Sequence, residues 1–89
     1  MAEYPKEVQA RDTDSLVGNF VVLWRGDGKD ARKVLAVVRS AWEEDGEVRV
    51  GYTLQSGLEV GKDFNARYDP NQKVIVYDEG SKILAGLEC

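Results

Sequence analysis

Aromatic and basic side chains lie close together near the middle of this chain, and they are residue types with which proteins hold a partner. Trp24 is followed directly by Arg25, and Lys29 and Arg32 come shortly afterwards. Tyr68 stands just before an Asp-Pro turn. An exposed ring can stack on a peptide, a methylated amine or a base, and a neighbouring cation can hold an anion. We predict a binding surface at Trp24, Arg25, Lys29, Arg32 and Tyr68; the alternative is that the rings belong to the core.

Several catalytic chemistries are excluded by residue type. The chain has no histidine, which removes Ser-His-Asp and Cys-His arrangements and the commonest metal ligand. Its single cysteine, Cys89, cannot form a disulfide within the chain. The acidic run over residues 43–47 indicates an exposed turn, and raising a carboxylate pKa for catalysis needs burial. No catalytic residue, metal site or cofactor is predicted.

Charge is distributed unevenly along the chain. The net charge is −4, which disfavours broad binding to nucleic acid. Residues 25–39 nevertheless hold five basic and two acidic side chains, whereas residues 43–47 hold four acidic side chains and no basic one. The basic segment can meet phosphates, an acidic protein or the acidic segment of a second copy. No apolar run is long enough to span a bilayer, and the first eleven residues lack the apolar stretch of a signal peptide, so we expect a cytoplasmic protein without membrane contact.

Two alternating segments around an acidic turn predict a β-hairpin. Val34, Ala36, Val38 and Trp42 share one face of the first segment, and Val48, Val50, Tyr52 and Leu54 share one face of the second. Apolar residues at every second position are typical of half-buried strands. On this pattern Trp42 and Tyr52 are expected at or near the core.

Further strands follow from short apolar runs bounded by turn residues. The apolar run over 20–24 predicts a central strand covered on both faces, and the Asp-Pro-Asn-Gln turn at 69–72 predicts a second hairpin. The expected strands are 20–24, 33–42, 47–55, 64–68 and 73–77, with a helical turn near residues 82–85. Five short strands in this length predict a mainly β, small five-stranded SH3-like barrel. Their order resembles that of Tudor-type and KOW-type barrels, a likeness that implies no function.

One alternative fold remains open. Residues 30–44 also show apolar spacing suited to a helix, with Asp30 as its N-cap and Gly46 beyond its end. That interpretation predicts an α+β fold with a helix packed on an antiparallel sheet. In either case residues 1–15 are expected to be flexible or partly helical, and residues 16–89 to form a single small domain.

These observations favour a non-enzymatic binding module that mediates protein–protein interaction, including association of its own copies. The alternative is binding of single-stranded nucleic acid or RNA by the same barrel. An oligomeric enzyme with an active site between subunits is a third hypothesis, in which the chemistry would fall to tyrosine, lysine or carboxylate side chains.

Overall fold

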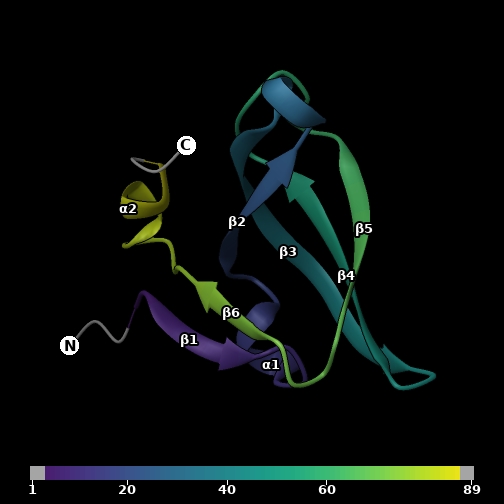
Figure 1. Cartoon of the computed structure of the whole chain (residues 1–89). Helices are drawn as coiled ribbons and strands as arrows, with labels where there is room; N and C mark the ends of the chain where they lie inside the picture. The colour runs from purple at the N-terminus through teal and green to yellow at the C-terminus, as the bar shows by residue number, and fades with distance from the viewer. Residues whose placement is uncertain (1–3, 87–89) are drawn as a thin grey trace.

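Strands dominate the computed structural model, which describes residues 4–86 and arranges them in two antiparallel sheets (Figure 1). The larger sheet has the order β2-β3-β4-β5 and the smaller pairs β1 with β6. The elements in chain order are β1 (Lys6–Gln9), α1 (Thr13–Leu16), β2 (Phe20–Arg25), the 3₁₀ turn η1 (Gly28–Asp30), β3 (Arg32–Glu44), β4 (Glu47–Leu54), β5 (Asp63–Tyr68), β6 (Lys73–Val76) and α2 (Lys82–Gly86). All five expected strands and the C-terminal helical turn are therefore confirmed, and the helical alternative for residues 30–44 is wrong.

The hairpin of β3 and β4 has a tight connection because two of its residues adopt positive φ. Asp45 has a φ of 53° and Gly46 a φ of 78°, and Glu44 pairs with Glu47 across the turn. Two left-handed residues in a two-residue loop match the twist of the strands that they join, which is why Asp-Gly is favoured there. The acidic turn is thus the tip of the longest hairpin in the described chain.

A β-bulge in β3 corrects the expectation for Trp42. The pairing with β4 shifts between Val38 and Ser40, so Arg39 is an extra residue in the ladder. Because one extra residue reverses the alternation of side chains, Ala41 continues the inner face after Val38 and Trp42 turns to the outer face. Trp42 is 44% exposed, whereas Tyr52 is buried as expected.

The expected barrel is not closed in the described residues. β6 pairs with β1 along its length and meets β2 only through one bridge between Tyr77 and Phe20. β5 pairs with β4 alone, which leaves the larger sheet open at that side. The physical reason is that Lys6–Gln9 is a strand and takes the pairing edge of β6. The segment expected to be flexible or partly helical, residues 1–15, thus contains a strand at Lys6–Gln9, and α1 begins within it at Thr13.

Apolar side chains gather on both faces of the larger sheet. The inner face holds the main core, which includes Val21, Val38, Val50 and Leu54, and the N-terminal residues Ala10 and Leu16 are buried in it. The outer face of β2 and β3 holds a smaller cluster of Phe20, Tyr77 and Ala85, and α2 brings the last of these. β2 is therefore covered on both faces near Phe20, as expected. It is not the central strand that the sequence predicts, because it ends the larger sheet and meets β6 only through the Phe20–Tyr77 bridge. In residues 4–86, no helix is long and apolar enough to cross a membrane.

Candidate functional site

The open end of the inner face forms a cleft of about 390 Å³, which we call the mouth. Val34 and Leu54, both buried core residues, form its floor. Its rim comprises Arg25, Gly26, Asp30, Arg32, Ser56, Gly57, Leu58 and Glu59. An apolar floor below a charged rim can take an apolar group of a ligand and orient it by a polar one.

Glycine is required at two places where loops close over the mouth. Gly26 has a φ of 95°, and a Cβ atom there would lie 2.7 Å from the carbonyl oxygen of Asp30. Gly57 has a φ of 85°, and a Cβ atom would lie 3.0 Å from Cγ1 of Val34. Only glycine adopts such backbone angles without strain and permits so close an approach. The two loops are thus shaped by backbone packing against the cleft.

Hydrogen bonds fix the second loop to β3. Ser56 Oγ accepts a hydrogen bond from the backbone N–H of Leu35 at 2.8 Å, and the N–H of Gln55 donates to the carbonyl of Leu35 at 2.7 Å. The loop that carries Leu58 therefore starts from a fixed position. Leu58 itself is 99% exposed at the rim of the mouth. Leu58 therefore adds an apolar group to the rim that a ligand in the cleft can contact.

At the mouth, Arg25 of β2 contacts the opposite side of the larger sheet, where β5 and the loop before it lie. Its guanidinium carbon lies 4.0 Å from the centre of the Phe64 ring, and its NH2 donates to Glu59 Oε1 at 3.4 Å. Its Nε is buried and makes no hydrogen bond within the described part of the chain. The guanidinium is therefore held in place by its stacking on Phe64 and its ion pair with Glu59.

The structure brings together only part of the surface expected from the sequence. Arg25 and Arg32 pair across β2 and β3 and both line the mouth. Lys29 lies in η1 in the loop beside them and is exposed. Within residues 4–86 neither Lys29 nor Arg32 forms an ion pair.

Trp24 and Tyr68 lie apart from this cleft. Trp24 points to the outer face, is 66% exposed, and has the Lys33 ammonium 5.5 Å from its ring centre. Tyr68 ends β5 at the edge of the main core, away from the mouth. Burial raises the pKa of the Tyr68 hydroxyl, and Tyr52 nearby raises it further. Trp24 therefore flanks the mouth from the other face, whereas Tyr68 packs against the core.

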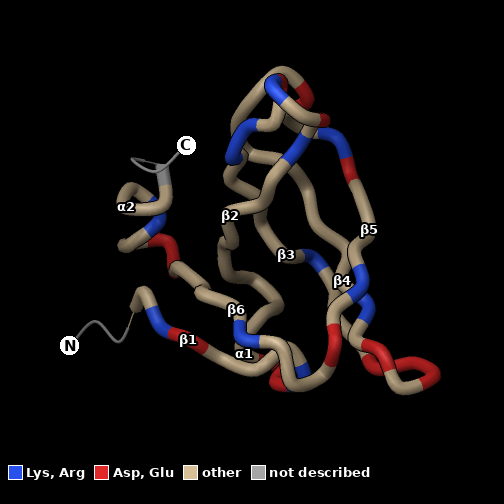
Figure 2. Tube along the Cα trace, viewed as in Figure 1, with Lys and Arg blue, Asp and Glu red and all other residues tan. Residues whose placement is uncertain are grey.

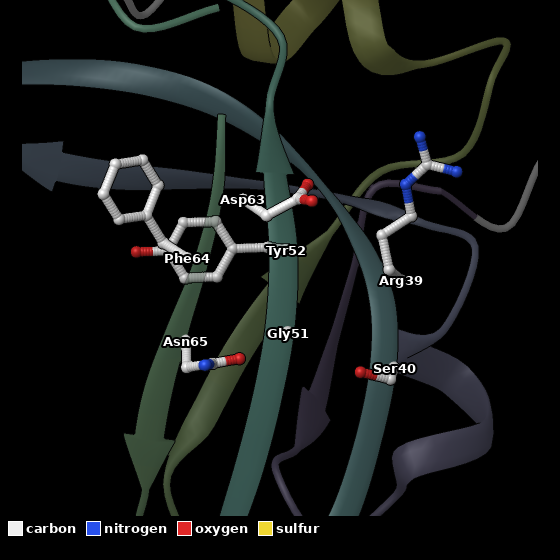
Figure 3. Close-up of a pocket in the computed structure, with 7 residues that line it drawn as sticks. All are labelled: Arg39, Ser40, Gly51, Tyr52, Asp63, Phe64 and Asn65. Atoms are coloured by element: carbon white, nitrogen blue, oxygen red, sulfur yellow. The ribbon is translucent and has the colours of Figure 1, made fainter. Parts of the chain in front are cut away.

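A second cleft, also about 390 Å³, lies on the outer face and was not anticipated from the sequence. Its floor is Gly51, and Figure 3 shows Ser40 and Asn65 reaching over this glycine from the neighbouring strands. Arg39, Tyr52, Asp63 and Phe64 complete the lining. We call it the Gly51 groove. Its one signal in the sequence is a glycine inside the clearest strand, which marks close approach of another group.

Hydrogen bonds order one end of the Gly51 groove. Arg39 Nε donates to Thr53 Oγ1 at 3.2 Å, and that hydroxyl donates to Asp63 Oδ1 at 2.5 Å. The bulge that turns Trp42 outward also places Arg39 in this chain of bonds. Because cation and carboxylate are both present, the groove can bind a polar group but has no strong preference for one sign of charge.

Charges separate along the β3–β4 hairpin. Figure 2 shows acidic residues at its tip, basic residues along its strands, and residues of both signs at the opposite end, where the mouth lies. No group of three or more His, Cys, Asp or Glu side chains is placed to hold a metal ion anywhere in the described range 4–86. The charged and apolar groups at the mouth support ion pairing and apolar contact.

No protein-family model, curated protein or solved structure matches the chain.

Proposed function

We propose that the protein is a non-enzymatic binding module that holds a segment of another protein at the mouth. The observation that carries this proposal is the combination, in one cleft, of a floor of core side chains and a rim with two arginines and a fully exposed leucine. Such a site suits an extended peptide with an apolar anchor and an adjacent carboxylate. The anchor would enter between Val34 and Leu54, and the carboxylate would meet Arg32.

The rim carries two cations, Arg25 and Arg32, and two anions, Asp30 and Glu59, so the choice of partner rests on how these charges pair. Glu59 is shared between Arg25 and Lys62, whose Nζ lies 4.0 Å from Glu59 Oε2. Arg32 has no such partner among the described residues and is exposed. A planar guanidinium matches a carboxylate in a bidentate pair, which gives orientation as well as attraction. Trp24 lies on the outer face at the same end of β2, and it would offer a platform to peptide residues that run past the end of the sheet.

Selection from a display library of random peptides tests the proposal directly. We expect enriched peptides with an apolar residue next to Asp or Glu, and loss of their binding to Arg32→Ala and Trp24→Ala proteins. Lys73→Ala is the matched control, because Lys73 is an exposed cation on β6 that pairs with Glu7. Equal binding by the wild-type and Arg32→Ala proteins, or failure to enrich any peptide, counts against the mouth as the site.

A second candidate function is contact with single-stranded nucleic acid on the outer face. The register aligns Trp42 of β3 with Arg49 of β4 and Arg67 of β5, a ring beside two cations in one row. Glu47 Oε2 lies 3.8 Å and 3.9 Å from the Nε atoms of the two arginines and reduces their attraction for phosphate. This candidate predicts a steep fall of affinity with salt, measurable by fluorescence anisotropy of a labelled oligonucleotide. Absence of binding at low salt removes it.

A further inference from the structure

The outer edge of β5 is free to accept another strand. β5 is the last strand of the larger sheet and pairs only with β4 among the described residues, and Figure 1 shows no strand beyond it. The N–H of Leu54 donates to the carbonyl of Lys62 at 3.0 Å. This hydrogen bond determines which residues of β5 direct their backbone N–H and C=O groups toward β4. Because the pattern has a period of two, Phe64, Ala66 and Tyr68 bond toward β4. The backbone groups of residues 63, 65 and 67 therefore point away from the sheet.

The side chains of β5 suit pairing with a second β5 strand that runs antiparallel. Asp63, Asn65 and Arg67 alternate on the outer face. If Asn65 pairs with Asn65 of another copy, Asp63 of each copy lies opposite Arg67 of the other, on the same face. Opposite charges directly across an antiparallel pair stabilise it. Shifting the centre to Ala66 would place Asp63 opposite Asp69, so the charges select the first register.

Both charged side chains are available for this pairing. Arg67 is 69% exposed, and its ion pair within the chain is a distant one, with Nε 3.9 Å from Glu47 Oε2. The Asp63 carboxylate is exposed and is held on the outer face by the hydroxyl of Thr53. On the inner face the same register sets Phe64 opposite Ala66, which are both apolar.

We propose that β5 mediates dimerisation of this protein, by antiparallel pairing with a second copy about a two-fold axis at Asn65. The two larger sheets then form one continuous sheet. In each copy, the mouth lies near the start of β5 and the acidic hairpin tip lies near its end. Because the two β5 strands run antiparallel, the mouth of one copy lies on the same side of the dimer as the hairpin tip of the other. It also joins the two Gly51 grooves across the axis, since Asn65 lines each of them.

Two single charge variants and their mixture test both the interface and its register. Asp63→Arg leaves two cations on the β5 strand of each copy, and Arg67→Asp leaves two anions there. In a dimer of either variant, like charges would therefore lie opposite each other and repel. We expect sedimentation velocity, under reducing conditions, to show wild-type dimers and at least about a tenfold rise in the dissociation constant for each variant. An equimolar mixture of the two should form dimers again, because the two cations on the β5 strand of one variant then lie opposite the two anions on that of the other.

Control variants separate the interface from general effects of charge and folding. Asp14→Arg makes the same change of charge on α1, away from β5, and should dimerise as wild type does. Asn65→Pro removes an N–H that points away from β4 and should abolish dimers while far-UV circular dichroism is unchanged. A wild-type protein that stays monomeric at several hundred micromolar overturns the proposal. So do dimers that survive both Asp63→Arg and Asn65→Pro, or a mixture that fails to associate.

Discussion

Arg25 and Phe64 lie at opposite ends of the larger sheet in strand order, yet the guanidinium of one stacks on the ring of the other at 4.0 Å. The contact draws β2 toward β5 at the end of the sheet where β2 finishes and β5 begins. It thereby curves the open sheet around its inner face and defines one wall of the mouth. A single cation–ring pair thus contributes both to the fold and to the proposed site.

The pairing of Arg25 with Phe64 should be measurable as a coupling energy. Arg25→Ala and Phe64→Leu should each lower the free energy of unfolding, and a double-mutant cycle should give a coupling of about 1 kcal/mol, as expected for a partly desolvated cation–π pair. Urea denaturation of the four proteins measures it. Free-energy changes that simply add would show that the two side chains stabilise the fold independently.

Backbone geometry at the hairpin tip predicts different effects for two adjacent residues. Gly46→Ala should lower the free energy of unfolding by about 1 kcal/mol, because a φ of 78° is strained for any residue with a Cβ atom. Asp45→Asn should be nearly neutral, since asparagine tolerates the left-handed region well. Chemical denaturation compares the two variants. Equal losses would contradict the assignment of strain to position 46.

Stability should fall in alkaline solution because of Tyr68. Burial raises the pKa of this hydroxyl in the folded state above its ordinary value of 10.0. The neutral Tyr68 hydroxyl therefore contributes its full stabilisation of the fold at a pH below its pKa in the unfolded chain. This contribution is lost as the pH rises through the pKa of Tyr68 in the folded state. The free energy of unfolding, measured from pH 8 upward, should decline less steeply for Tyr68→Phe. Identical slopes for the two proteins would show that Tyr68 ionises equally easily in both states.

The cap of α2 predicts a second dependence on pH, in the acidic range. Asp78 Oδ1 accepts a hydrogen bond from the N–H of Ser81 at 2.8 Å, and Ser81 Oγ accepts one from the N–H of Asp78 at 2.9 Å. Hydrogen bonds from Ser81 lower the pKa of the Asp78 carboxyl, so the stabilisation is present above its unfolded pKa and is lost as the pH falls through the folded one.

Two substitutions at Asp78 isolate this contribution. Asp78→Asn should keep the cap but show a weaker loss of thermal stability in acid. Asp78→Ala should lower the melting temperature at neutral pH as well, because α2 carries Ala85 onto Phe20 and Tyr77. If the aspartate and asparagine proteins show the same acid dependence by calorimetry, the cap does not depend on the charge.

The parts of the fold that the sequence predicts are those with local signals. The alternating segments, the Asp-Gly tip and the apolar run of β2 each carry their own pattern. β1 has no such pattern, because Val8 is the one apolar residue of Lys6–Gln9 and the strand depends on pairing with β6. Arg39 looks like any strand residue, and only the ladder with β4 makes it a bulge that turns Trp42 outward.

The candidate site was partly predictable for the same reason. Arg25 and Arg32 flank one loop, so proximity in sequence already indicates proximity in space. Leu58 and Glu59 come from a loop that reaches the mouth through Ser56, a contact with no signature in the residue pattern. Tyr68 shares its aromatic character with Trp24, but the direction of β5 places it far from the mouth, at the end of the strand opposite Phe64.

The most direct test of the proposed function is a titration of isotope-labelled protein with a selected acidic peptide, followed by two-dimensional NMR. We predict shift changes confined to residues 24–34 and 54–59, and none of these changes in an Arg32→Ala, Trp24→Ala double variant that keeps its fold. Shift changes centred instead on the β5 edge or the Gly51 groove, or unchanged binding by the double variant, would contradict a binding site at the mouth.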